Sequence, residues 1–174
     1  MFPGFVDAHG HFLGIGMREL TLNLENIGSI EELVAAVSDN IRDTDENDVL
    51  YGRGWIETNW PEKRAPNRQD LDAASTDIAI ILERADGHAV VVNSLAMTKA
   101  GIDRNTPDPD GGRIEKDSDG NPTGVLVDNA SSLVMTLVSS PDEDRKKLAY
   151  SKANQVYAGY GLSLIHISEP TRPY

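Results

Sequence analysis

Two histidines separated by a single residue, His9 and His11, follow a short apolar segment near the start of the chain. In an extended segment, residues i and i+2 point to the same side, so both imidazoles can face one point beyond the end of a strand. Imidazole nitrogen is a common ligand of zinc and similar divalent ions. The spacing therefore predicts two ligands of a metal site, although a bare His-x-His in a loop also arises by chance.

Two further residues could take part in the same chemistry. Asp7 lies on the same face of the expected strand as His9, where its carboxylate could support a ligand or cap the end of the strand. His88 follows the apolar run 78–82, and the ends of parallel strands are where α/β barrels present active-site groups. The alternative for His88 is a purely structural histidine, which is the more common case near a strand end.

Arg53 and Trp55 occupy a comparable position in the strand expected at 49–56. They could contact a substrate, or they could be a surface arginine and a core tryptophan. The acidic residues Asp128 and those of the loop 117–121 fit solvated turns and caps, so we assign them no chemical role.

Strands and helices alternate along the chain, which is typical of an α/β fold with parallel strands. Apolar runs predict strands at 4–8, 49–56 and 78–82, and the last is expected to be buried on both faces. We expect the strands near 4–8, 49–55 and 78–84 to lie parallel, with His9, His11 and His88 converging on one end. A hairpin with an Asp119-Gly120 turn is expected to join 113–115 to 123–125.

Capping residues and apolar stripes locate the expected helices. These are 30–42 after a capping box at Ser29, 67–74 capped by Asn67, 93–100 capped by Asn93 and ended by Gly101, 126–138, and 141–160 after a capping box at Ser140. The buried stripe of the last helix is expected to consist of Leu148, Ala149, Ala153, Val156 and Tyr157. Residues 15–26 are expected to be an irregular connection.

Composition limits the classes of partner. The chain has 28 acidic and 16 basic residues, and its net charge of −12 opposes binding to nucleic acid or an anionic membrane. The acidic excess fits either a solvated acidic face or a salt-adapted surface. Without cysteine, any metal must be held by nitrogen and oxygen ligands. No apolar run has the length of a membrane span and no signal-peptide pattern is present. The compartment stays open, and a cytoplasmic location is favoured.

The segment Pro-Gly-Phe-Val-Asp-Ala-His-Gly-His, residues 3–11, resembles the first barrel strand of the amidohydrolase superfamily. Later segments resemble the subgroup that includes N-substituted formamide deformylase; they are 52–55, 60–61, 84–89, 93–94, 111–114 and 120–126. The resemblance covers residues 3–161. It implies an incomplete (β/α)₈ TIM barrel of the metal-dependent hydrolase type, with an inserted β-hairpin.

The resemblance also implies roles for single residues. His9 and His11 would bind a divalent metal, with zinc the expected ion, and the substrate-binding residues would be His88, Asp86, Trp55 and Arg53. The implied reaction is hydrolysis of a C–N bond, of amide or formamide type, in a small molecule by metal-activated water. The alternative is a non-catalytic binding or regulatory protein that keeps the fold.

Such a site also needs a general acid/base carboxylate and further histidines, which the family places on later barrel strands. We therefore expect no catalytic acid/base within this chain, and we interpret residues 1–161 as the N-terminal part of a barrel domain in a longer protein that could form homo-oligomers. Residues 162–174, including His166, resemble a translated sequencing adapter and are expected to be non-native, the alternative being an unstructured native tail. The isolated piece would leave apolar strand faces uncovered.

Overall fold

The computed structural model describes residues 3–42, 44 and 48–165 of the 174-residue chain. These form two compact units. The terminal unit consists of Met1–Thr21 together with Ser140–Tyr174, and the central unit is Leu22–Ser139. In sequence, the central unit is therefore an insertion between the two halves of the terminal unit.

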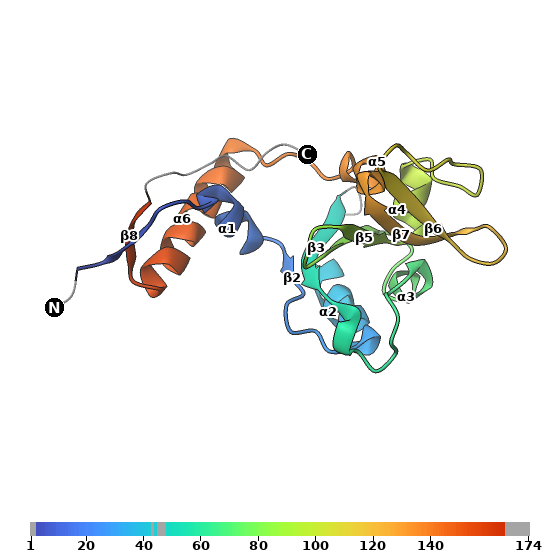
Figure 1. The fold of residues 1–174 in the computed structure, drawn as a ribbon, viewed down its shortest axis with the longest axis horizontal. Helices are drawn as coiled ribbons and strands as arrows, with labels where there is room; N and C mark the ends of the chain where they lie inside the picture. Colours follow the sequence, from blue (N-terminus) through green and yellow to red (C-terminus); the bar gives the residue numbers. More distant parts are fainter. Residues whose placement is uncertain (1–2, 43, 45–47, 166–174) are drawn as a thin grey trace. The chain divides into compact units, whose positions relative to one another are not determined.

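The terminal unit contains two strands and two helices (Figure 1), namely β1 (Phe5–Asp7), α1 (Phe12–Arg18), α6 (Glu143–Gly159) and β8 (Leu162–Ile165). The strands β1 and β8 pair in parallel, with Phe5 opposite Leu162 and Val6 opposite Leu164. A parallel pair requires a crossover connection, and the two helices, with the whole central unit between them, belong to it.

Helices α1 and α6 pack closely because glycine stands at their crossing. Gly16 is buried, and a Cβ atom added there would lie 1.8 Å from the carbonyl oxygen of Ala149. The ring of Phe12 lies against those of Tyr150 and Tyr157, with centroids 6.0 and 5.2 Å away. Gly16 thus occupies a position where any side chain would collide with the backbone of the partner helix.

The long helix α6 is present as predicted, but its cap is different. Asp142 caps it, accepting a hydrogen bond of 2.7 Å from the backbone N–H of Arg145, so the capping box expected at Ser140 is wrong. The side chains of Ala149, Ala153 and Tyr157 are buried as expected. Leu148, predicted to join them, is 50% exposed.

The central unit is built on one six-stranded mixed sheet (Figure 1). Its strand order is β2 (Leu22–Asn23), β3 (Val49–Trp55), β4 (Ala79–Arg84), β5 (Ala89–Val92), β7 (Pro122–Asp128) and β6 (Gly112–Lys116). The strands β2, β3 and β4 run parallel, whereas β5, β7 and β6 pair antiparallel.

Helices cover both faces of this sheet (Figure 1). On one side lie α2 (Ile30–Ile41) and α3 (Arg68–Asp72), and on the other α4 (Ser94–Lys99) and α5 (Ser132–Met135). Two short 3₁₀ turns, Glu57–Asn59 and Asn129–Ser131, complete the unit.

Alternate residues of the middle strands face the two helical layers. Ile80 and Leu82 of β4 pack in a hydrophobic cluster with residues of α2 and α3. Ala79 and Ile81 pack in a second cluster with residues of α4 and α5. The apolar run at 78–82 is therefore buried on both faces, as the sequence predicts.

The structure confirms α/β architecture and corrects several details. Residues 12–18, expected to lie in or next to an irregular connection, form α1, and β5 was not predicted. The helix expected over 126–138 is wrong at its start, because 126–128 continue the strand β7. The expectation that the strands near 4–8, 49–55 and 78–84 lie parallel is confirmed for β3 and β4, whereas β1 belongs to the other unit and pairs in a separate sheet. No closed barrel is formed by the described residues.

The sheet of the terminal unit is poorly covered, as expected for a piece of a larger domain. Phe5 is 71%, Val6 54% and Leu164 52% exposed. Strand β8 lies inside the segment 162–174, which we predict to be non-native. A strand can form whatever the origin of its sequence, so the non-native origin of this segment stays a prediction. His166 lies outside the described residues. Among the helices of residues 3–42, 44 and 48–165, none combines the length and apolar character that crossing a bilayer requires.

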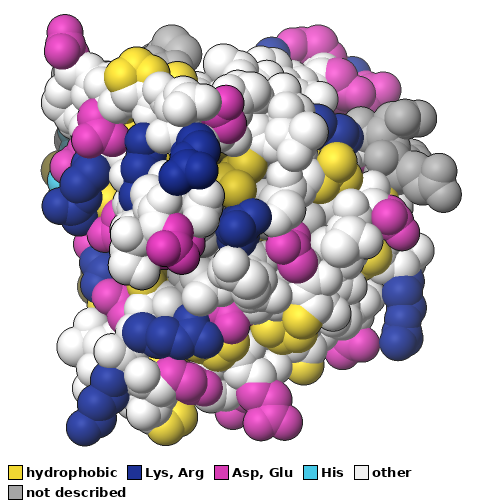
Figure 2. All heavy atoms as spheres, turned by 90° about the vertical axis from the view of Figure 1, so that its right-hand side faces the viewer, with side chains coloured by type: hydrophobic (Ala, Val, Ile, Leu, Met, Phe, Trp, Pro, Cys, Tyr) yellow, Lys and Arg dark blue, Asp and Glu magenta, His cyan; other side chains and the backbone are white. Residues whose placement is uncertain are grey.

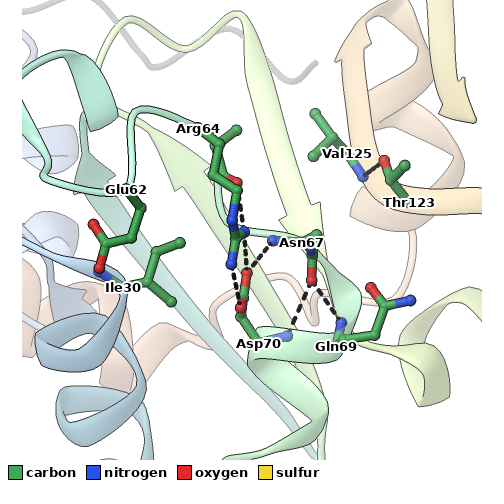
Figure 3. A network of polar contacts seen from close by, with 9 residues as sticks. Ile30, Glu62, Arg64, Asn67, Gln69, Asp70, Thr123 and Val125 are labelled. Atoms are coloured by element: carbon green, nitrogen blue, oxygen red, sulfur yellow. Dashed lines mark hydrogen bonds and ion pairs between the residues drawn. The ribbon is translucent and has the colours of Figure 1, made fainter. Parts of the chain in front are cut away.

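A capping box with an ion pair fixes the start of α3 (Figure 3). The side chain of Asn67 accepts from the backbone N–H groups of Gln69 and Asp70, and Asp70 accepts in return from the N–H of Asn67 at 2.8 Å. Arg64 binds both carboxylate oxygens of Asp70, at 2.7 and 2.9 Å. Burial alone would raise the pKa of Asp70, but the hydrogen bonds from Arg64 and Asn67 and the arginine charge outweigh it and lower the pKa.

We expect the substitution Asp70→Ala to destabilise the central unit by about 1–2 kcal/mol at neutral pH, because it removes a cap and a charge-assisted pair. A carboxylate whose pKa is lowered by folding stabilises the protein above its unfolded pKa and loses this effect as the pH falls through its folded pKa. In denaturant melts, the free energies of unfolding of D70A and of the parent chain should therefore converge below about pH 4. The matched control is D39A, whose carboxylate is 74% exposed and 3.9 Å from Arg42, and which should change stability by less than about 0.5 kcal/mol.

Candidate functional site

The histidine pair lies where β1 gives way to α1. His11 is the residue immediately before α1, and the backbone N–H of His9 donates a hydrogen bond of 3.0 Å to Asp7 Oδ1. The two imidazole rings have centroids 5.6 Å apart and an interplanar angle of 71°. Both side chains are exposed, so they are accessible to an ion.

This ring separation fits a shared metal ion. Two imidazoles bound to one zinc at about 2.0–2.1 Å have ring centroids roughly 5 to 5.5 Å apart. The pair offers two imidazole nitrogens, a ligand type that suits zinc and related divalent ions. Within the part of the chain that the structure describes, no third His, Cys, Asp or Glu side chain completes a cluster able to hold a metal. His9 and His11 would therefore supply only part of a ligand set.

Asp7 supports the turn that carries the two histidines. Its Oδ1 accepts from the backbone of His9, and its Oδ2 accepts from the Tyr157 hydroxyl at 3.4 Å. A Cβ atom at Gly10 would lie 2.5 Å from that hydroxyl oxygen, so glycine is needed there. Burial, followed by the charge of Asp7, raises the pKa of Tyr157, which keeps the phenol a neutral donor. The sequence marked Tyr157 only as a core residue, because nothing local links it to Asp7.

In the central unit, His88 is held by two acidic residues. Its backbone N–H donates to Asp86 Oδ1 at 3.0 Å, and its ring Nδ1 lies 2.9 Å from Asp128 Oδ1. Its backbone carbonyl accepts from the N–H of Asp128 at 2.8 Å. The resemblance implied that Asp86 is a substrate-binding residue, whereas the sequence gave Asp128 no role beyond a turn or cap.

An arginine anchors the turn that contains Asp86. Arg84 forms a bidentate pair with Glu57, at 2.9 and 3.1 Å, and a second ion pair with Asp86. The N–H of His88 lowers the pKa of Asp86, and the charge and hydrogen bond of Arg84 add to this effect. Burial would raise the pKa of Glu57, but its bonds to Arg84 outweigh this and lower it. Both carboxylates are therefore held in the ionised form.

The remaining predicted residues, Trp55 and Arg53, lie on β3. Trp55 is 1% exposed, and its indole N–H donates to the carbonyl of Leu82 at 3.0 Å, which favours its interpretation as a core residue. The guanidinium of Arg84 lies 5.9 Å from the centroid of its ring. The side chain of Arg53 is 41% exposed and lies 4.0 Å from Glu83, so it remains accessible to a ligand.

The structure gathers Arg53, Asp86 and His88 at the carboxyl ends of β3 and β4, the edge at which α/β sheets bind ligands. His9 and His11 belong to the terminal unit, so the predicted convergence of His9, His11 and His88 stays a prediction.

On the face shown in Figure 2, lysines and arginines are interspersed with aspartates and glutamates, unlike the continuous basic patch of a nucleic-acid interface.

Comparisons with known proteins agree with these features. The chain is 44% identical over 138 residues to YtcJ of Bacillus subtilis (strain 168), a protein named as an amidohydrolase, covering 79% of this chain and 26% of YtcJ. It is 30% identical over 168 residues to N-substituted formamide deformylase of Arthrobacter pascens, covering 92% of this chain and 31% of that protein. The chain thus spans between a quarter and a third of the length of these relatives.

A solved structure shares the fold. The chain aligns with an uncharacterized metal-dependent hydrolase from Pyrococcus horikoshii OT3 with a TM-score of 0.63 and 21% identity, over 94% of this chain and 30% of that one. The sequence pattern of the amidohydrolase family matches residues 1–172, nearly the whole chain. The chain belongs to the amidohydrolase family.

Proposed function

We propose that this chain is part of a metal-dependent hydrolase that cleaves a C–N bond of amide or formamide type in a small molecule. The observation that carries the proposal is the His9–His11 pair, placed directly after β1 with ring centroids 5.6 Å apart. Family membership supports hydrolysis, and the relative named N-substituted formamide deformylase supports the type of bond.

Each residue near the pair has a role in this proposal. His9 and His11 would hold the ion, with zinc the expected metal for nitrogen ligands. When bound, a divalent ion supplies Lewis acidity, which polarises a carbonyl group and acidifies water. Asp7 and Tyr157 hold the turn that carries His9 in place, a supporting role typical of residues around metal ligands. Arg53, Asp86 and His88 would contact or orient the substrate.

We further propose that β1 is a strand of an incomplete TIM barrel and that β8, whose residues we predict to be non-native, lies where the neighbouring barrel strand belongs. They are parallel, they are connected through helices, and their apolar side chains are exposed as if neighbouring barrel elements were missing. In this view, the insertion into the barrel is the whole central unit. The predicted inserted hairpin is its β6–β7 part, which pairs with β5 in the six-stranded sheet.

The test uses the full-length protein encoded by the complete reading frame. Purified protein should contain a divalent metal, and it should hydrolyse at least one member of a panel of N-substituted amides and formamides. Removal of the metal by a chelator should abolish this activity, and adding the metal back should restore it. A metal-loaded protein without activity on the whole panel would contradict the proposal and favour the non-catalytic binding or regulatory alternative.

A further inference from the structure

His88 is held at three points although its side chain is 75% exposed. Asp86 binds its backbone N–H, and the backbone N–H of Asp128 binds its carbonyl oxygen. The carboxylate of Asp128 binds ring Nδ1 at 2.9 Å. An exposed surface histidine usually keeps its rotational freedom, and ordering it has an entropic cost. A fixed orientation at this position therefore calls for an explanation.

Asp128 adopts an unfavourable backbone conformation while making this contact. Its φ and ψ angles are 49° and −125°, a region that residues other than glycine rarely occupy. Strained residues of this kind are concentrated at functional sites, where the surrounding structure holds them in place. Here the hairpin β6–β7 supplies the constraint, because Asp128 is the last residue of β7 and pairs with Gly112 of β6.

We propose that Asp128 is a positioning residue that fixes His88 as the tautomer with hydrogen on Nδ1. An ionised carboxylate only accepts hydrogen bonds, so Nδ1 must be the donor in this contact. The other ring nitrogen, Nε2, is then an acceptor with a fixed direction. This inference rests on the proposed role of His88 in substrate contact. In addition, it assigns to the carboxylate of Asp128 the role of making that contact specific.

The charged surroundings of His88 are compatible with this arrangement. Asp86 and Asp128 both bind it, and Asp86 is also paired with Arg84. Arg84 is already bound on both sides by Glu57 and Asp86. Asp128 is therefore the carboxylate that acts on the ring of His88, whereas Asp86 acts on its backbone.

The first test is spectroscopic and needs no substrate. Nitrogen-15 NMR of the intact chain at a pH where imidazole is neutral should show His88 predominantly as the Nδ1–H tautomer, with its signal assigned by loss in H88Q. In the variant D128G, the signal should revert to the mixture found for free histidine, in which Nε2–H dominates. An Nε2–H tautomer in the parent chain would overturn the proposal.

Glycine is the informative substitution because it removes the carboxylate and also relieves the backbone strain. If Asp128 were merely structural, D128G would be neutral or stabilising and would leave activity unchanged. We expect instead a melting temperature that is retained or raised, together with a fall in kcat/KM of the full-length protein of about tenfold or more. The variant D128N, which keeps the size of the side chain, should lose activity as well. Unchanged kcat/KM in both variants would contradict the positioning role.

The matched control is K63G, since Lys63 has a φ of 50° and lies outside the proposed site. Like D128G, K63G should relieve backbone strain, but it should leave both the tautomer of His88 and kcat/KM unchanged.

The variant H88Q separates this proposal from the proposed function. If H88Q has full activity, His88 does not serve the reaction, whereas the tautomer measurement still decides whether Asp128 fixes the ring.

Discussion

Replacing His9 and His11 together by alanine is expected to remove the metal from the full-length protein and to lower hydrolysis on the order of a thousandfold or more. In the proposed site the pair would supply two of the ligands, and a divalent ion without them would be held weakly. Without the ion, the reaction loses the Lewis acid that activates water. Metal content by elemental analysis and kcat/KM on the best substrate of the panel measure the two effects.

The control for this prediction is His88→Ala, which removes an imidazole proposed to contact the substrate. It should lower activity while leaving metal content at the level of the parent protein. If the double variant H9A/H11A kept its metal, the ligands would lie elsewhere and the proposed site would be wrong. If H88A also lost the metal, His88 would be a ligand and its assigned role would have to change.

The substitution Gly16→Ala is expected to destabilise the terminal unit by about 3 kcal/mol, at the upper end of the usual cost of overpacking. The added methyl group would lie 1.8 Å from a backbone oxygen at Ala149 and 2.4 Å from the attached carbon. Neither atom belongs to a flexible side chain, so the helices α1 and α6 must separate. The loss should exceed that of an average point substitution.

Two kinds of aromatic residue make this effect measurable. The chain has two tryptophans, Trp55 and Trp60, and both lie in the central unit, whose denaturation they report by fluorescence. In G16A the tryptophan transition should stay at the denaturant concentration of the parent chain. The near-ultraviolet circular dichroism of the tyrosines packed on α1, Tyr150 and Tyr157, should be lost at a lower concentration.

Gly159 is the matched control, because it is also a helical glycine but has no neighbouring atom within 4 Å of an added Cβ. Gly159→Ala should stabilise α6 by roughly 0.5–1 kcal/mol, the usual difference between the two residues in a helix. If G16A and G159A behaved alike, the close crossing of α1 and α6 would be wrong.

Features governed by neighbouring residues were predicted well from the sequence. Ser29, Asn67 and Asn93 each cap the helix assigned to them, since a cap is recognised within three residues. The hairpin turn at Gly120 has the positive φ of 81° that glycine tolerates. The strand β4 was recognised because a continuous apolar run reflects burial on both faces.

Features governed by distant residues were missed. Gly14 and Gly16 disfavour a helix by intrinsic propensity, yet α1 forms because Gly16 packs on α6, more than a hundred residues away in sequence. Similarly, the sequence placed His88 at the end of a strand but could not pair it with Asp128, which a separate hairpin delivers. The histidine pair was found because its two members are two residues apart.

The insertion of the central unit also determines the order in which the two units can fold. Gly16 of α1 packs on Ala149 of α6, so the terminal unit can form only after the central unit has been synthesised, and closing such a long loop of unfolded chain is entropically costly. All strands of the six-stranded sheet lie before Ser139, and this sheet can form while the ribosome, adding about 5–20 residues per second, is still completing α6. During synthesis, β1 and α1 therefore emerge before the central unit but reach their folded state after it, and the exposed apolar strand β1 is available to chaperones for that whole interval.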